Sequence, residues 1–218
     1  LDALLFCGVY AIMTPPGMQG NDPIEVIFSI AVLIFSVIAH EVSHGYMAQY
    51  LGDPTARLAG RLTMNPIKHI DPIGSILVPI VTVLLPGGFV FGWAKPVPYN
   101  PYNLRDQKWG DAKVALAGPL TNFGIAIFFA LLIRLASADL SPALFYLMNV
   151  IVMINLILGV FNLVPIPPLD GSKVLINALP FRYRYVADYI ERYSLALILI
   201  FAFFLWEYVF PLVEFLYL

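Results

Sequence analysis

Two histidines and a glutamate stand together inside an apolar stretch and could form a metal-dependent hydrolytic site. His40, Glu41 and His44 spell His-Glu-x-x-His within residues 24–50, which read as one long apolar helix. Residues four apart on a helix differ by about 40° in azimuth and about 6 Å along the axis, so both imidazoles can reach one zinc ion. Glu41, about 100° further round, is well placed to take a proton from an attacking water. The motif therefore predicts zinc-assisted hydrolysis with Glu41 as the general base.

A zinc site of this kind needs a third protein ligand, and the residues alone leave several open. One soluble pattern places Gly and then His after the second histidine, but Met47 and Tyr50 occupy those positions. No glutamate occurs between Glu41 and Glu191. The remaining candidates are one histidine and seven aspartates: His69, Asp53, Asp71, Asp106, Asp111, Asp139, Asp170 and Asp188.

Asp170 stands in an unusual place among these candidates. It follows an uncharged run at 140–169, and three prolines interrupt the helix just before it. Non-helical backbone at membrane depth occurs where it lines a site, so a carboxylate there suggests a metal ligand. The alternative is that Asp170 caps a short helix beginning at Gly171. Spacing alone does not separate these two interpretations.

The composition indicates a protein that lies in a membrane. Hydrophobic residues make up 60% of the 218 positions, charged residues 12%, and the mean hydropathy is +0.83, which excludes an ordinary soluble globule. A net charge of −2 with no basic stripe argues against a nucleic-acid partner. Cys7 is the only cysteine, so neither an intrachain disulfide nor a thiolate metal site can form. We expect an integral multi-pass membrane protein surrounded by lipid.

Several charge-poor runs are long enough to cross a bilayer, which needs roughly 20 apolar residues per helix. They predict an all-α polytopic bundle whose spans cover residues 24–50, 114–133, 143–161 and 195–215. We expect one transmembrane domain over 1–218, with an N-terminal fragment at 1–22, a catalytic core at 24–182 and a C-terminal span within 188–218.

Residues 72–94 are uncharged but rich in Pro and Gly, a poor composition for an uninterrupted helix. If this segment crossed the membrane, the cations would divide eight against four between the two sides. If it enters and returns, the division is eleven against one, with Arg134 alone on the outer side. The positive-inside rule favours the second arrangement, so we predict a re-entrant segment.

Four motifs carry a resemblance to a known family. They are His-Glu-Val-Ser-His at 40–44, Gly-Trp-Ala-Lys-Pro-Val-Pro at 92–98, Ala-Gly-Pro-Leu-Thr-Asn at 117–122 and Asn-Leu-Val-Pro-Ile-Pro-Pro-Leu-Asp-Gly at 162–171. In this order, over residues 24–182, the sequence resembles the site-2 protease family of zinc intramembrane metalloproteases. Such a combination is far more specific than any one of the motifs.

The resemblance implies one Zn²⁺ per chain held by His40, His44 and Asp170, with Glu41 as the general base. It also implies that Asn162 lines the active site and polarises the scissile carbonyl, although Asn162 could equally make a hydrogen bond within the bundle. The chain resembles a compact member without a PDZ or CBS domain. It implies a prokaryotic cell-membrane protease that cuts single-span membrane-protein substrates at a site within the bilayer, toward the cytoplasmic side.

A transmembrane substrate must unwind before attack, so we expect short β-strands between the metal motifs to hold it. Residues 56–63 and 88–92 have strand-like composition, and either could pair with substrate by strand addition. Two other functions stay open, a membrane zinc transporter and a catalytically inactive scaffold that binds transmembrane helices. The transporter would have no use for Glu41. The oligomeric state does not follow from the sequence.

Overall fold

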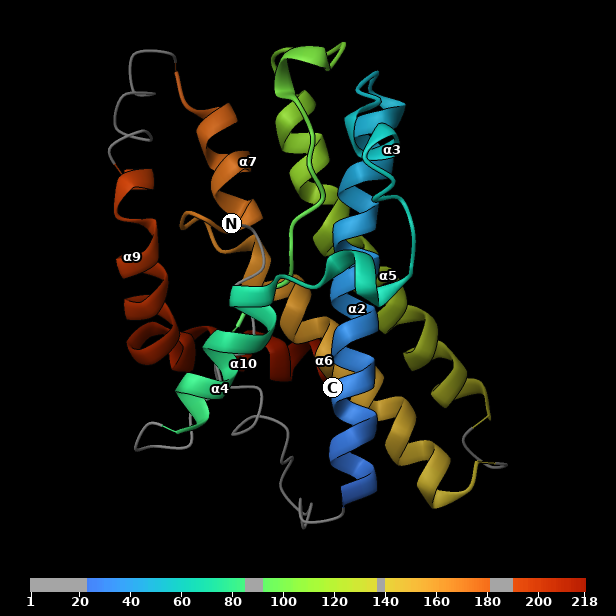
Figure 1. Ribbon diagram of the computed structural model, residues 1–218. Helices are drawn as coiled ribbons and strands as arrows, with labels where there is room; N and C mark the ends of the chain where they lie inside the picture. The colour runs from blue at the N-terminus through green and yellow to red at the C-terminus, as the bar shows by residue number, and fades with distance from the viewer. Residues whose placement is uncertain (1–22, 85–91, 137–139, 181–189) are drawn as a thin grey trace.

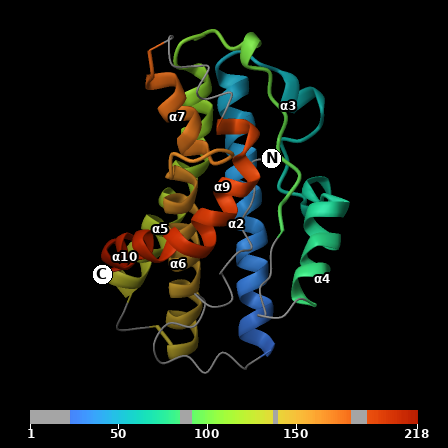
Figure 2. The same cartoon turned by 90° about the vertical axis from the view of Figure 1, so that its left-hand side faces the viewer.

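Three long helices lie side by side and form the body of the protein (Figures 1 and 2). The computed structural model describes residues 23–84, 92–136, 140–180 and 190–218. The long helices are α2 (Pro23–Tyr50), α5 (Gly110–Ala136) and α6 (Pro142–Leu163), and each is long and apolar enough to cross a membrane. The predicted helical bundle is therefore confirmed, and the first three predicted spans are helices whose ends lie within four residues of those expected.

Local capping bonds explain why α5 and α6 begin where they do. Asp106 Oδ1 accepts hydrogen bonds from the amides of Lys108 (3.1 Å) and Trp109 (2.9 Å) at the turn that leads into α5. Ser141 Oγ accepts one from the Leu144 amide (3.3 Å) at the start of α6. These side chains replace the partners that the first amides of a helix lack.

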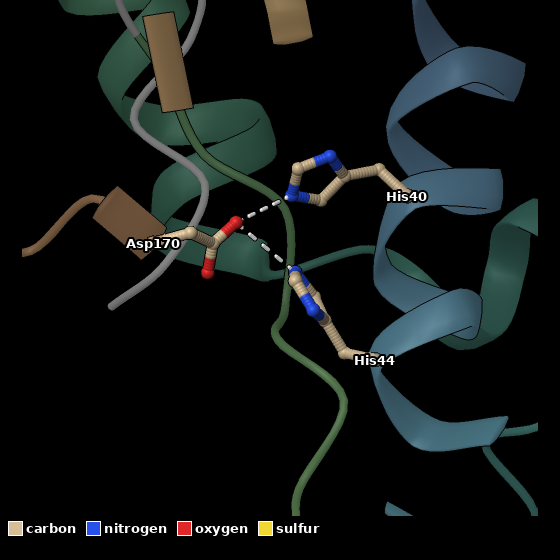
Figure 3. Close-up of side chains that lie close together, drawn as sticks. All are labelled: His40, His44 and Asp170. Atoms are coloured by element: carbon tan, nitrogen blue, oxygen red, sulfur yellow. Dashed lines mark hydrogen bonds and ion pairs between the residues drawn. The ribbon is translucent and has the colours of Figure 1, made fainter. Parts of the chain in front are cut away.

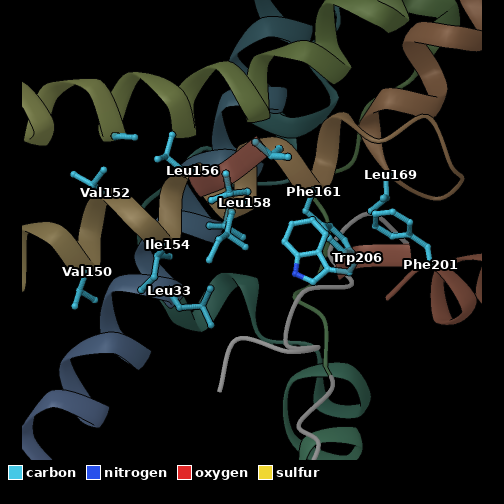
Figure 4. Close-up of a cluster of buried hydrophobic side chains, with 14 of the residues drawn as sticks. Leu33, Val150, Val152, Ile154, Leu156, Leu158, Phe161, Leu169, Phe201 and Trp206 are labelled. Atoms are coloured by element: carbon cyan, nitrogen blue, oxygen red, sulfur yellow. The ribbon is translucent and has the colours of Figure 1, made fainter. Parts of the chain in front are cut away.

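The core of the molecule is organised around α6. Residues 154–162 are nine consecutive buried positions, which leaves no face of this part of the helix open. Phe161 packs against Phe201 and Trp206, with ring centroids 5.6 and 5.4 Å away, so the C-terminal helices close one side of the cluster (Figure 4). Leu169, 2% exposed, fixes the segment just before Asp170 in the same cluster.

Short elements fill the interval between α2 and α5. They are α3 (Thr55–Leu58), η1 (Pro66–His69), η2 (Pro72–Leu77), α4 (Val78–Val83) and η3 (Pro101–Asn103). They run beside α2 (Figures 1 and 2).

The strands expected between the metal motifs are absent from this interval as far as the structure describes it. The prediction for residues 56–63 is wrong, because the segment begins inside α3. Asp53 Oδ1 accepts hydrogen bonds from the Thr55 amide (3.2 Å) and hydroxyl (2.6 Å), so the backbone finds local partners and starts a helical turn. Of the other predicted strand, 88–92, only Gly92 lies within the described residues.

The apolar segment at 72–94 begins as the joined helices η2 and α4, which end at Val83. Their twelve residues rise about 18 Å, too little for a hydrocarbon core of about 30 Å. Where the chain is next described, the Trp93 amide donates to Gly74 O (2.9 Å) and Ser75 Oγ donates to Trp93 O (2.8 Å). The two ends of the segment therefore lie together. Its course through 85–91 falls outside the described residues, so re-entry stays a prediction.

The C-terminal part of the chain is divided into several helices. Asp170 opens α7 (Asp170–Ala178), and the later apolar stretch forms α9 (Ser194–Ile200), η5 (Phe201–Leu205) and α10 (Trp206–Tyr217). In Figures 1 and 2 α10 turns away from the direction of α9. The expected C-terminal span is thus interrupted at η5, and its crossing of the membrane stays a prediction.

Candidate metal centre

The side chains of His40, His44 and Asp170 converge in the interior of the bundle (Figure 3). Asp170 Oδ2 lies 3.0 Å from His40 Nε2 and 3.3 Å from His44 Nε2. All three residues are buried, with relative exposures of 3%, 6% and 2%. Helix α2 supplies the histidines one turn apart, and α7 supplies the carboxylate from 130 residues away. These three residues could hold a metal ion.

The other ring nitrogen of each histidine contacts an oxygen atom. His40 Nδ1 donates to Asn122 Oδ1 (2.6 Å), and His44 Nδ1 donates to the Val114 carbonyl (2.7 Å). With Nδ1 carrying the proton, Nε2 of each neutral ring presents a lone pair. Both lone pairs then point at a carboxylate oxygen, so three acceptors meet at one place. A cation between them removes that conflict.

The spacing of these atoms fits zinc. Ligand atoms about 2.0–2.1 Å from a tetrahedral Zn²⁺ lie about 3.3 Å from one another. Asp170 Oδ2 lies 3.0 and 3.3 Å from the two Nε2 atoms, and all three ligand atoms lie within 4.8 Å of one another. Two imidazole nitrogens and one carboxylate oxygen also form the donor set of many catalytic zinc sites, which leave a fourth position open. The residues present therefore fit this metal.

A chain of buried amides fixes the orientation of His40. Asn122 Nδ2 donates to Asn155 Oδ1 (2.9 Å), which turns the Asn122 oxygen toward the histidine. Asn155 Nδ2 donates in turn to Ser36 Oγ (3.0 Å) and to the Ile151 carbonyl (2.9 Å). The chain links α5, α6 and α2, and each amide is fully buried. In the sequence Asn122 stands out only as the last residue of the third motif and as a polar residue inside the uncharged run at 114–133.

Glycine at position 118 permits the close approach of α5 to both histidines. A Cβ atom at Gly118 would overlap His40 Nε2 and would lie 2.6 Å from His44 Cε1. No side chain can be accommodated there without moving an imidazole. The small residue in the Ala-Gly-Pro motif thus forms one wall of the metal centre.

Asp170 faces the histidines and does not cap a helix. It is the first residue of α7, whose N-cap is Leu169, and its Oδ2 atom makes the two contacts with the imidazoles. Of the two interpretations that spacing left open, the geometry favours the metal ligand.

Glu41 lies beside this group, fully buried at 1% exposure. Its Oε2 atom accepts a hydrogen bond from the Val97 amide (3.0 Å), in the extended segment that carries the second motif. One to two turns earlier on the same face of α2 there is a mostly apolar cavity of about 240 Å³, bordered by Ile38, Trp93 and Ala94. The cavity therefore lies on the Glu41 face of α2, although Glu41 is not among the residues that line it.

Three other candidate residues satisfy nearby backbone, while Asp139 and Asp188 lie outside the described residues. Asn162 is buried, and its amide donates to Leu158 O (2.9 Å), one turn back in α6. His69 Nε2 contacts Thr63 O (2.9 Å), and burial lowers the pKa of its imidazole. Asp71 accepts hydrogen bonds from two amides at the start of η2. The role of Asn162 at the scissile carbonyl stays a prediction.

Comparison with known families agrees with this geometry. The family model described as Peptidase family M50 matches residues 28–145 and 136–205, and these segments include the metal-binding group and Glu41. The chain belongs to Peptidase family M50. This finding confirms the resemblance that the four motifs carry.

Several relatives of this M50 protein bear the name zinc metalloprotease, most of them provisionally. YwhC of Bacillus subtilis is 36% identical over 180 residues, covering 79% of this chain and 78% of its own length. Rip2 of Mycolicibacterium smegmatis is 32% identical, covering 68% of this chain but 56% of its own length. MJ0611 of Methanocaldococcus jannaschii is 33% identical, over 68% of this chain and 72% of its own. No solved structure matches the chain.

Proposed function

We propose that this M50 protein is a zinc-dependent intramembrane endopeptidase that cuts transmembrane segments of single-span membrane proteins. The observation that carries the proposal is the convergence of His40, His44 and Asp170 next to the buried carboxylate of Glu41. Its relatives bear names that include zinc metalloprotease, and these names support zinc as the metal. The three apolar helices around the group support a membrane location.

In this proposal His40, His44 and Asp170 hold one zinc ion. Zinc in such a site lowers the pKa of a bound water to about 7 and polarises a peptide carbonyl. Asn122 and the Val114 carbonyl keep the proton on Nδ1 of each histidine, which keeps Nε2 available for the metal.

Glu41 moves the protons. Its carboxylate takes a proton from the water as that water attacks the scissile carbonyl, and it returns the proton to the leaving nitrogen. The bundle excludes bulk water from Glu41 and Asp170, which are 1% and 2% exposed. The cavity of about 240 Å³ that begins one turn earlier on α2, at Ile38, offers room for an apolar substrate side chain, since a cavity of about 150 Å³ already admits benzene.

The site is proposed to lie within the bilayer, nearer the cytoplasmic side. His40 is 17 residues after the start of α2 at Pro23 and 10 before its end at Tyr50. At about 1.5 Å per residue, these spacings place it about 26 Å from the first end and about 15 Å from the second. The segments that follow Tyr50 carry most of the cations, which face the cytoplasm by the positive-inside rule. Re-entry of 72–94 is part of this proposal, supported by the contact of Trp93 with Gly74.

A paired glutamate experiment tests the proposal. Purified wild type, Glu41→Gln and Glu25→Gln are incubated in detergent with a synthetic single-span peptide, and the products are mapped by mass spectrometry. Glu25 lies on the same helix but near its start, where it contacts Tyr146. We expect Glu25→Gln to cut like wild type and Glu41→Gln to lose about 10²- to 10⁴-fold in rate while keeping its zinc. Equal cutting by all three would contradict the proposal, and zinc flux across vesicles that survives Glu41→Gln would favour a transporter.

A further inference from the structure

Arg61 is a buried cation in the segment between α3 and η1. Its relative exposure is 7%, and it is the one buried Lys or Arg in the part of the chain that the structure describes. Burying a charge is costly unless an opposite charge or several hydrogen bonds compensate it. A guanidinium in this position therefore calls for a specific partner.

The contacts of Arg61 provide only part of that compensation. Nη2 donates to the Lys95 carbonyl (2.7 Å), while Nε is buried and makes no hydrogen bond with the described residues. Burial lowers the pKa of the guanidinium, and the negative charge of Glu41 opposes that shift. Glu41 is therefore the carboxylate that interacts electrostatically with Arg61.

The Lys95 carbonyl belongs to an extended segment, residues 92–98, that is tied down at alternate positions. The amides of Trp93, Lys95 and Val97 donate to Gly74 O (2.9 Å), His69 O (2.9 Å) and Glu41 Oε2 (3.0 Å) respectively. Pro96 stands between the last two of these donors and restricts the backbone dihedrals there. A shift of the Lys95 peptide, whose carbonyl accepts the hydrogen bond from Arg61, would therefore also shift the Val97 amide.

Packing brings the same two segments together on α2. A Cβ atom at Gly45 would meet the side chains of Leu62 and Val97, the latter at 2.8 Å. Gly45 lies one turn after Glu41. Leu62, which follows Arg61, and Val97, whose amide donates to Glu41, therefore both lie against α2 at Gly45.

We propose that Arg61 is a positioning residue for the general base. It holds the Lys95 carbonyl so that the Val97 amide keeps the Glu41 carboxylate directed at the attacking water. This inference rests on the proposed function, because it gives Glu41 the role of the base. If Arg61 were only a tie within the loop, its loss would resemble the loss of any other bond that fastens residues 92–98.

The test compares Arg61→Gln with two matched variants. Ser75→Ala removes another side-chain bond to the same extended segment, at Trp93 O, and Arg57→Gln makes the same substitution at an exposed site in the neighbouring helix α3. For each variant, kcat, KM and zinc content are measured with the single-span peptide. We expect Arg61→Gln to lower kcat about 10- to 100-fold with KM and zinc content unchanged, the cost of a misplaced catalytic group. Arg61→Lys, which keeps the charge, should recover part of kcat.

The outcomes separate the two proposals. The role of Arg61 is overturned if kcat falls no further in Arg61→Gln than in Ser75→Ala, or if KM rises while kcat stays constant. Either result would do so even if Glu41 is essential. Should Arg61→Gln fail to fold, Arg61→Lys decides by the same split between kcat and KM. Cutting that does not depend on Glu41 refutes the proposed function, and the role of Arg61 with it.

Discussion

Asn122 acts on the proposed zinc site through His40. Its carbonyl accepts the Nδ1 proton at 2.6 Å, so Asn122→Ala leaves the ring free to rotate or to change tautomer. We expect zinc affinity to fall about 10- to 100-fold, measured by competition with a chromophoric chelator. Asn177→Ala is the control, because that amide only donates to its own helix at Lys173 O. Equal affinities for the two variants would contradict this role.

Gly118 makes a second prediction at the scale of one residue. Gly118→Ala places a methyl group against both imidazoles, whereas a Cβ atom at Gly124, on the same helix, meets nothing within 4 Å. We therefore expect Gly118→Ala to lose zinc binding and activity, and Gly124→Ala to keep both. Metal analysis of the two purified proteins provides the measurement. Full zinc occupancy in Gly118→Ala would show that the rings are not confined as the geometry implies.

Residues close together in the sequence could be predicted to share a site, whereas residues that the fold brings together could not. His40, Glu41 and His44 lie within one helical turn, so spacing alone placed them together. Asp170 is 130 residues from His40, and residue reasoning left it one candidate among several until the motifs suggested a family. Arg61 entered only as one of the cytoplasmic cations, because no pattern in the sequence links it to Lys95 or Glu41.

At the scale of elements, Asp53 joins the end of α2 to the segment before α5. Its carboxylate accepts hydrogen bonds from the Thr55 hydroxyl (2.6 Å), the Asn100 amide (2.7 Å) and Asn103 Nδ2 (2.8 Å). Burial raises the pKa of Asp53, but these hydrogen bonds outweigh it and hold the pKa below its ordinary value. The ionised form is therefore favoured in the folded state.

This shift predicts a dependence of stability on pH. A carboxyl group with a lowered folded pKa stabilises the protein above its unfolded pKa, about 3.9, and that stabilisation is lost as the pH falls through the folded value. We expect Asp53→Asn to lower the unfolding temperature in detergent at pH 7, and the difference from wild type to shrink below about pH 4. A difference that stays constant from pH 7 to pH 3 would contradict the assignment.

Helices were easier to predict than the elements between them. Apolar length is a local signal, so three long helices were predicted within a few residues of their ends. The strand predicted at 56–63 from its composition was wrong, because the Thr55 amide finds a local partner in Asp53 Oδ1 and the chain forms the short helix α3 instead. The interruption of the last apolar stretch at η5 could not be predicted from the sequence, because η5 contains no Pro or Gly.

At the scale of the whole molecule, the cation distribution predicts which segments share a side of the membrane. With Cys7 replaced by Ser, single cysteines are placed at Leu58, Tyr102 and Leu135, which are 77%, 88% and 83% exposed. In right-side-out vesicles with an impermeant maleimide, we expect Leu58→Cys and Tyr102→Cys to be protected together and Leu135→Cys to react. Labelling of Leu58→Cys and Tyr102→Cys from opposite sides would mean that 72–94 crosses the membrane.

In the proposed function two helices far apart in the sequence share one zinc ion, so the decisive measurement is the zinc content of Asp170 variants. Zinc is counted per chain in purified wild type, Asp170→Ala and Asp111→Ala, the last a control whose carboxylate contacts Tyr99 away from the histidines. We predict one zinc in wild type and in Asp111→Ala, and its loss from Asp170→Ala. An Asp170→Ala protein that holds zinc as tightly as wild type would contradict the account.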